Sequence, residues 1–195
     1  MGCKKSTKSN AAVDPARLSE VIVYSYDSFC GEWGSGPEIA RLFEEKTGLK
    51  VTFIDCGDGV QILSKAVLEK KDPYADVLLG LDNNLTDKAK ESDVFESFKP
   101  SNAAVVADGL EEALGGKWLM TPYDYSPFAI IWNSLSDVQA PACLEDLTKD
   151  VYKKKLILMG TRTSTPGLGF ETCVTKANGS KAADYMKRLE PSILT

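Results

Sequence analysis

Along residues 21–81, segments whose apolar positions have the spacing of a β-strand alternate with segments that have the spacing of an α-helix. This pattern predicts strands that alternate with helices. Residues 21–26 are β-branched and aromatic, which favours a buried strand. A helix is predicted to begin at Gly36-Pro37 and to end at Gly48, because proline fits a first helical turn and glycine the position after the last one. The pattern then predicts a strand over 49–53, a helix from Gly59 to about residue 70, and a strand over 75–81.

This β-α-β-α-β order predicts a parallel sheet with right-handed crossovers. Polar turns containing Asp27, Asp58 and Asp82 follow the three strands. Because the carboxyl ends of parallel strands share one rim, these turns are expected to lie together, where open α/β sheets bind their ligands. Asp82 and the asparagines after it are interpreted as residues that hold the loop by side-chain to backbone hydrogen bonds.

The second half of the chain is predicted to cross into another lobe and to continue there. An extended crossing is expected over 119–133, followed by a short helix over 144–152 and a strand over 156–159. A further helix is predicted to begin at Pro166, with Ser164 or Thr165 as its cap. A helix over 181–189 and the beginning of a strand at 193–195 complete the pattern.

These segments define three parts of the chain. Residues 1–17 are polar and are expected to form a flexible tether. Residues 18–120 are predicted to form a first α/β lobe. Residues 121–195 are predicted to contain a crossing strand and part of a second α/β lobe.

The composition excludes several classes of function. The net charge of −5 and the isoelectric point near 4.9 provide no basic stripe for nucleic acid. The chain has no histidine, which rules out a Ser-His-Asp triad, a histidine base and histidine-ligated zinc. Its five cysteines form no C-x-x-C pair, so a metal site is weakly supported and none is predicted.

The N-terminal residues Met1-Gly2-Cys3 allow three interpretations. Cys3 is predicted to be the lipidated residue of a bacterial lipoprotein, which would attach the protein to a membrane only through that lipid. Myristoylation of Gly2 is an alternative, because Met-Gly-x-x-x-Ser fits that pattern. A start of the chain without any such signal is the third.

Several ordered motifs resemble the thiamine-binding periplasmic proteins of ABC importers. They are Tyr26-Asp27-Ser28-Phe29 with Trp33-Gly34-x-Gly36-Pro37, Asp58-Gly59-Val60, Ala75-Asp76-Val77, Gly80-Leu81-Asp82-Asn83-Asn84, Pro122-Tyr123-Asp124-Tyr125, and Arg162 to Gly169. The resemblance implies an α/β, two-lobed, type 2 periplasmic-binding-protein-like fold. Family members continue well past the position of Thr195, so the fold is expected to be incomplete at the C-terminus.

The resemblance also implies a function. The chain is expected to be the solute-binding component of an ABC importer, periplasmic, with thiamine or thiamine phosphates as ligand and the transporter permease as partner. No catalytic activity and no cofactor are expected. By motif match, Asp58 with Gly59 and Ser164 with Thr165 fall on ligand-contacting positions of the family, one pair on each lobe.

The chemistry of thiamine suggests further site residues. Tyr26, Trp33 and Tyr125 are candidates for stacking on its rings, and Asp27 and Asp58 for balancing its positive charge. Structural alternatives remain open. Tyr26 and Trp33 would instead pack the first helix on the sheet, the two aspartates would cap turns or helices, and the Ser164-Thr165 loop would be only a cap.

Two competing functions remain. An iron(III), phosphonate or polyamine binder of the same fold is the nearer alternative, and clustered Tyr123 and Tyr125 are its limited support. A thiaminase-like enzyme is the other, in which Cys30 or Cys56 beside the rim would attack the ligand. Neither cysteine has an obvious activating partner in the sequence, which favours a binding protein.

Overall fold

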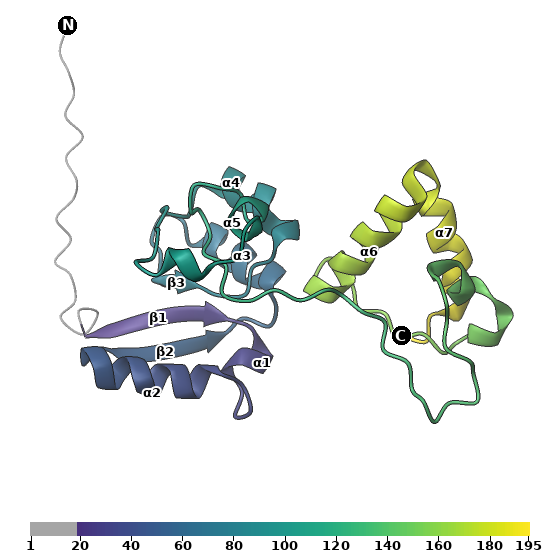
Figure 1. Ribbon diagram of the computed structural model, residues 1–195, viewed down its shortest axis with the longest axis horizontal. Helices are drawn as coiled ribbons and strands as arrows, with labels where there is room; N and C mark the ends of the chain where they lie inside the picture. Colours follow the sequence, from purple (N-terminus) through teal and green to yellow (C-terminus); the bar gives the residue numbers. More distant parts are fainter. Residues whose placement is uncertain (1–18) are drawn as a thin grey trace, which may run out of the picture.

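The computed structural model describes residues 19–195, in two lobes joined by a long irregular segment (Figure 1). Cys3 and its predicted lipidation lie outside the described residues. The lobes have separate hydrophobic cores, one around Tyr24 and the other around Tyr185.

The first lobe is built on a three-stranded parallel sheet. Its strands are β1 (Glu20–Ser25), β2 (Lys50–Asp55) and β3 (Val77–Leu78), in the spatial order β2-β1-β3. Val23 of β1 lies opposite Phe53 on one side and Val77 on the other. The predicted parallel β-α-β-α-β arrangement is therefore confirmed.

The helices α2 (Gly36–Thr47) and α3 (Gly59–Leu68) cover opposite faces of this sheet (Figure 1). The chain moves from β1 to β2 in one direction and from β2 back past β1 to β3 in the other, so two right-handed crossovers place their helices on opposite sides. Proline occupies the first turn of α2, and Gly48 ends it with a left-handed φ of 76°. Both predicted helix signals are confirmed.

Two local predictions for this lobe were wrong. Residues Asp27–Cys30 form a helical turn, α1, where only a turn was expected, because Phe29 is buried against the rings of Tyr26 and Phe53. Strand β3 has two residues instead of the predicted seven-residue span 75–81. Gly80 ends the extended backbone with a φ of +109°.

The core of the first lobe combines apolar packing with the hydroxyl of a buried tyrosine, Tyr24. Ile22, Tyr24 and Ile62 are almost completely buried. The Tyr24 hydroxyl donates to Glu69 Oε2 at 2.7 Å, and Lys65 lies over the tyrosine ring while pairing with Glu69. The Tyr24 hydroxyl is thereby satisfied.

Short helical elements follow β3. These are η2 (Asn83–Leu85), α4 (Thr86–Ser92), η3 (Ala103–Val105) and α5 (Leu110–Ala113). The Asp82 side chain accepts from the backbone N–H and the side-chain amide of Asn84, at 3.1 and 2.7 Å. Its predicted role in holding the loop is confirmed.

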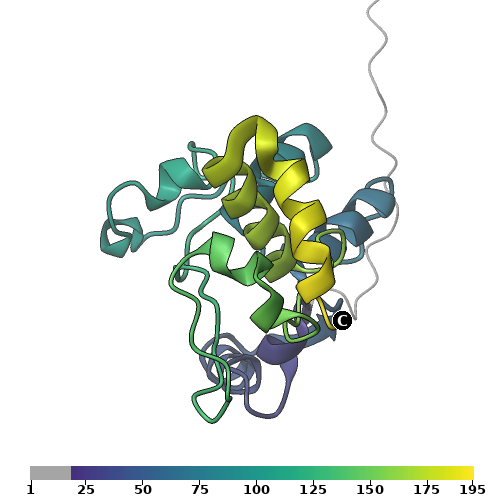
Figure 2. The same cartoon turned by 90° about the vertical axis from the view of Figure 1, so that its right-hand side faces the viewer.

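The second lobe is mostly helical. Helices α6 (Thr165–Asn178) and α7 (Ala182–Leu189) are joined by a tight turn from which they diverge (Figure 1), and short 3-10 turns pack beside them (Figure 2). Those turns are η4 (Leu144–Thr148), η5 (Asp150–Tyr152), η6 (Gly179–Lys181) and η7 (Glu190–Ser192). The core contains Leu147, Val174, Tyr185 and Leu189, and the Tyr185 hydroxyl donates to the Leu144 carbonyl at 2.6 Å.

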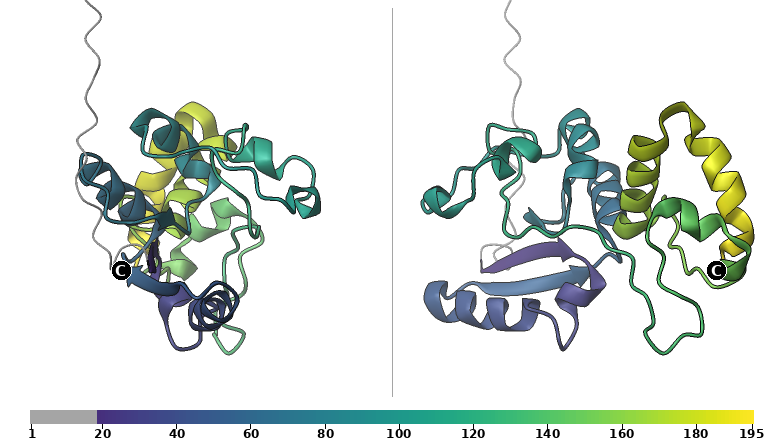
Figure 3. Two further views of the ribbon diagram at one scale, coloured as in Figure 1. Left: turned by 90° about the vertical axis from the view of Figure 1, so that its left-hand side faces the viewer. Right: turned by 45° about the vertical axis from the view of Figure 1, so that its right-hand side comes forward.

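Three predictions for the second half need correction. The helix expected over 144–152 is two 3-10 turns, because Lys149 between them is extended. The strands expected at 156–159 and 193–195 are reduced to one parallel bridge between Leu156 and Ile193. The crossing has no assigned strand, although it passes from one lobe to the other as expected (Figure 3).

Candidate functional site

Asp58 lies at the first-lobe side of the candidate site, where β2 passes into α3. It has an extended backbone, with φ −149° and ψ 166°, and caps the helix by accepting from the Gly59 N–H at 2.6 Å. A carboxylate at this position stabilises the positive end of the helix dipole. The capping role left open by the sequence is confirmed.

Ser164 and Thr165 lie at the second-lobe side, at the beginning of α6. Ser164 is buried, and its hydroxyl accepts from the Gly167 N–H at 3.4 Å, which confirms the predicted cap. Gly167 must be small, since a Cβ atom there would lie 2.5 Å from the Met159 carbonyl oxygen. The helix start is therefore packed directly on the preceding loop.

The two sides meet through a hydrogen bond between the lobes. The Thr165 hydroxyl donates to Asp58 Oδ1, although 107 positions separate the two residues. Gly59 permits this approach, because a Cβ atom there would lie 3.1 Å from Thr165 Oγ1 and 2.5 Å from the Gly80 carbonyl oxygen. Four of the predicted site residues, Asp58, Gly59, Ser164 and Thr165, are thus gathered where two helices begin.

Tyr26 belongs to an aromatic corner near the carboxyl end of β1. Its hydroxyl is 2.7 Å from the Tyr123 hydroxyl on the crossing segment, and Phe29 packs against both rings, with centroid distances of 5.6 and 6.4 Å. Burial, together with the hydrogen bond to Tyr26, raises the pKa of Tyr123 above its usual value. Tyr123 therefore stays neutral at physiological pH.

Tyr123 was not among the predicted site residues. Its place in the Pro122-Tyr123-Asp124-Tyr125 motif was a signal, but the sequence does not show which of the two tyrosines turns toward β1. Tyr123 contacts the corner, whereas Tyr125 is 75% exposed.

Trp33 and Asp27 are not gathered with the others. Trp33 is 96% exposed on the loop before α2, so the alternative that it packs this helix on the sheet was wrong. Asp27 is exposed, and its carboxylate accepts from the adjacent Ser28 N–H at 2.5 Å. The capping role that the sequence left open for Asp27 was wrong, because Tyr26 occupies the N-cap of α1 and Asp27 lies inside its first turn.

A cavity of about 280 Å³ lies beside the crossing segment. Its lining includes Asp82 and Asn83 from the end of the third strand region, and Tyr123, Tyr125 and Phe128 from the crossing. The volume is slightly below the usual range of about 300–1,000 Å³ for small-molecule sites. Tyr125 thus lines a cavity, although it does not reach Asp58 or Thr165 by any hydrogen bond found among residues 19–195.

The cysteines near the rim have ordinary, unactivated surroundings. Cys30 and Cys56 are both half-buried, and burial raises the pKa of each thiol. A reactive cysteine needs the opposite shift. Within residues 19–195, no three cysteine and acidic side chains gather as a metal site would require, and no helix is long and apolar enough to cross a membrane.

The family of the chain follows from comparison with known proteins. The family model described as bacterial extracellular solute-binding protein matches residues 72–190, and the chain belongs to this family. The type 2 periplasmic-binding fold predicted from the motifs is confirmed.

Individual proteins of known name are also similar to this chain. The thiamine-binding periplasmic protein of Brucella abortus biovar 1 (strain 9-941) is 33% identical over 178 residues, which cover 90% of this chain and 52% of that protein. A solved periplasmic thiamin binding protein superposes with a TM-score of 0.75 at 30% identity, covering 89% of this chain and 54% of the other. A ferric binding protein from Campylobacter jejuni shares the fold at 19% identity, with a TM-score of 0.65, covering 90% of this chain and 54% of its own. The chain therefore spans about half the length of the relatives that it matches.

Proposed function

We propose that this chain is part of the solute-binding protein of an ABC importer and binds thiamine or thiamine phosphates between its two lobes. The observation that carries the proposal is the meeting of Asp58 with Thr165 across the lobes. Support comes from the names of relatives that are about one-third identical, which describe thiamine-binding periplasmic proteins.

Asp58 and Tyr26 suit the cationic thiazolium ring of thiamine. An attraction between unit charges 4 Å apart near a protein surface is worth about 4 kcal/mol before desolvation. A cation over an aromatic face adds roughly 0.5–2 kcal/mol. The Tyr26 ring packs against Phe29 and against Gly80, where a Cβ atom would lie 2.3 Å from that ring. Because the ring is already fixed, ligand binding would cost little side-chain entropy at Tyr26.

The beginning of α6 suits the other end of the ligand. Helix N–H groups and the hydroxyls of Ser164 and Thr165 are donors for a phosphate or a hydroxyl group. A bound ligand would replace Asp58 as the partner of the Thr165 hydroxyl. Exchange of one hydrogen bond for another costs little, because net hydrogen-bond energies are only about 1 kcal/mol.

A solute-binding protein of this kind would work in the periplasm and deliver its ligand to a permease, with the membrane reached only through lipid on Cys3. The chain is proposed to bind without catalysis, since burial raises rather than lowers the pKa of Cys30 and Cys56.

Amide chemical shifts of the isotopically labelled chain, measured during a thiamine titration, test the proposal. We expect millimolar binding, with the largest shifts at Gly59 and Thr165. The variant Asp58→Asn should weaken binding about tenfold, the effect of losing one charged hydrogen-bond partner of about 1.4 kcal/mol. Asp87→Asn is the matched control, because Asp87 is an exposed aspartate in the first turn of α4 and should leave the affinity unchanged.

Three results would contradict the proposal. Shifts confined to residues far from the two helix starts would place the ligand elsewhere. Equal affinity of Asp58→Asn and the parent would remove the carboxylate from the site. Tighter binding of ferric citrate than of thiamine would favour the iron(III) alternative.

A further inference from the structure

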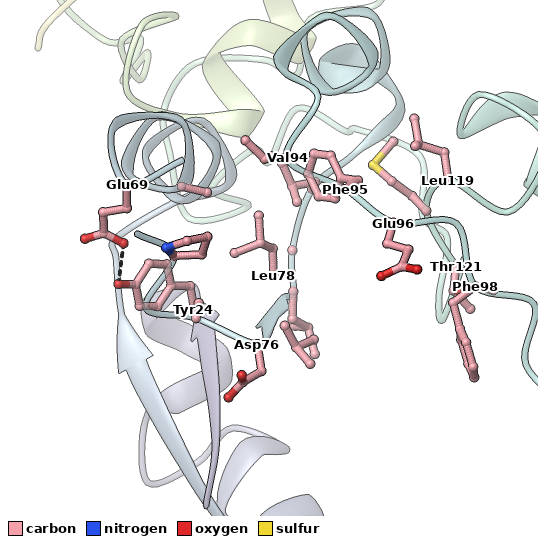
Figure 4. A pocket seen from close by; sticks show the side chains of 18 of the residues that line it. Tyr24, Glu69, Asp76, Leu78, Val94, Phe95, Glu96, Phe98, Leu119 and Thr121 are labelled. Atoms are coloured by element: carbon pink, nitrogen blue, oxygen red, sulfur yellow. Dashed lines mark hydrogen bonds between the residues drawn. The ribbon is translucent and has the colours of Figure 1, made fainter. Parts of the chain in front are cut away.

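Met159 is the most exposed of the methionines that the structure describes. It precedes the loop that leads into α6 and is 51% exposed. Met186 packs against the core of the second lobe, and Met120 lines a cavity of about 810 Å³ beside β3, together with Phe95 and Leu119 (Figure 4). Both are only partly exposed. Met159 therefore offers its thioether sulfur to solvent more openly than the other two.

The same sulfur is the outer end of a short chain of hydrogen bonds at the candidate site. The Ser164 hydroxyl donates to Met159 Sδ at 3.4 Å and accepts from the Gly167 N–H at 3.4 Å. Ser164 is only 7% exposed, so its hydroxyl has little access to water that could replace the sulfur. A change at the sulfur thus reaches the first turn of α6 through a single side chain.

The backbone around Met159 leaves little room for adjustment. Its carbonyl oxygen lies against Gly167, where a Cβ atom would be only 2.5 Å away. The Ser164 N–H donates to the Gly160 carbonyl at 3.0 Å, which closes the loop between the methionine and the helix. The loop and the helix start are therefore packed on each other, and a larger or more polar group on the sulfur must displace part of them.

We propose that Met159 is a site of reversible oxidation by peroxide, and that its oxidation loosens the beginning of α6 and weakens ligand binding there. The sulfur lone pair attacks one oxygen of hydrogen peroxide, the O–O bond breaks, and a proton transfer yields the sulfoxide and one water. The sulfur loses two electrons, which the peroxide gains. A methionine sulfoxide reductase restores the thioether. The effect on the ligand rests on the proposed function, whereas the oxidation and the local change at the helix do not.

The sulfoxide cannot keep the geometry of the thioether. A hydroxyl that donates to the new oxygen lies about 2.7 Å from it, and the S–O bond adds to this distance, so the sulfur and the Ser164 hydroxyl must move apart from their 3.4 Å separation. If the oxygen points to solvent instead, the sulfur carries partial positive charge and is a poor acceptor, so the buried hydroxyl loses its partner. In both cases the cap of α6 is disturbed, and with it the donors proposed for the ligand.

The test treats the full 195-residue chain with limiting hydrogen peroxide and then with dithiothreitol, which reduces disulfides and sulfenic acids of the cysteines but leaves methionine sulfoxide. Peptide mass mapping should find the added oxygen on Met159 before Met120 or Met186. Without ligand, the amide chemical shifts of Ser164, Thr165 and Gly167 should change. Thiamine should bind about fivefold more weakly, the effect of one lost hydrogen bond. Sulfoxide reductases specific for each of the two epimers, used together, should reverse both changes.

Two variants make the test specific, and each is compared with its own untreated form. Met159→Leu keeps an apolar side chain of similar size without the sulfur, so peroxide should change neither its amide shifts at the helix start nor its affinity for thiamine. Met186→Leu is the matched control, because Met186 packs against the second-lobe core. This variant should remain as sensitive to peroxide as the parent.

Three results would overturn the proposal. They are first oxidation at Met120 or Met186, unchanged amide shifts at the beginning of α6 in protein oxidised at Met159, and an equal loss of affinity in treated Met159→Leu. An untreated parent that does not bind thiamine would instead contradict the proposed function. The mass mapping and the ligand-free amide shifts would still decide whether oxidation of Met159 loosens the helix start.

Discussion

Replacement of Gly59 by alanine tests the packing that brings the two helix starts together. A Cβ atom at this position would lie 2.5 Å from the Gly80 carbonyl oxygen, closer than real Cβ contacts, and 3.1 Å from Thr165 Oγ1. The threonine side chain can rotate, but the carbonyl belongs to the backbone. The beginning of α3 must therefore move away from the end of the third strand region.

The expected cost is the balance of two terms. Overpacking of this kind destabilises by about 2 kcal/mol, whereas alanine in place of glycine in a helix returns up to about 1 kcal/mol. The net loss in the free energy of unfolding is about 1 kcal/mol. For the first lobe, with roughly 100 residues, this lowers the melting temperature by roughly 4–8 °C.

Thermal unfolding followed by circular dichroism measures the effect, and amide exchange in β1 assigns it to the first lobe. Gly160→Ala is the matched control, because its Cβ atom would meet only the Thr163 hydroxyl at an ordinary 3.4 Å. Gly59→Ala combined with Thr165→Ala should recover little stability, since the backbone contact remains. Equal melting temperatures for Gly59→Ala and Gly160→Ala would refute the reasoning.

Three further predictions concern other contacts. Tyr185→Phe should lower the free energy of unfolding of the second lobe by about 1–3 kcal/mol, because the Leu144 carbonyl loses its partner; urea unfolding measures this, and an unchanged midpoint would contradict it. The hydrogen bond from Lys65 lowers the pKa of Glu69. The stabilisation that the ionised Glu69 contributes is therefore complete above about pH 4.3 and is lost as the pH falls through the lowered pKa. Glu69→Gln should flatten the acid side of the plot of stability against pH, and an unchanged plot would exclude a contribution from this pair. Thiamine incubated with a nucleophile should remain intact, and Cys30→Ser should behave like the parent; free thiazole that disappears in this variant, detected by mass spectrometry, would favour an enzyme.

Much of the secondary structure was determined locally by the sequence. Pro37 and Gly48 mark the ends of α2 because their backbone preferences act within a few residues. The same holds for Asp58 and Ser164, whose side chains cap the helices that follow them. The parallel order of the strands also followed from the alternation of elements, since right-handed crossovers leave few topologies.

Tertiary structure decided the features that depend on residues far apart in the chain. The α1 turn exists because Phe29 is buried against Phe53, and propensity over so short a segment is too weak to reveal this. The bond between Asp58 and Thr165 joins positions 107 apart, and no local pattern encodes their distance. Trp33 is a further example. A tryptophan within a motif suggests contact with a ligand or with the core, but the path of its loop determines that the ring remains exposed.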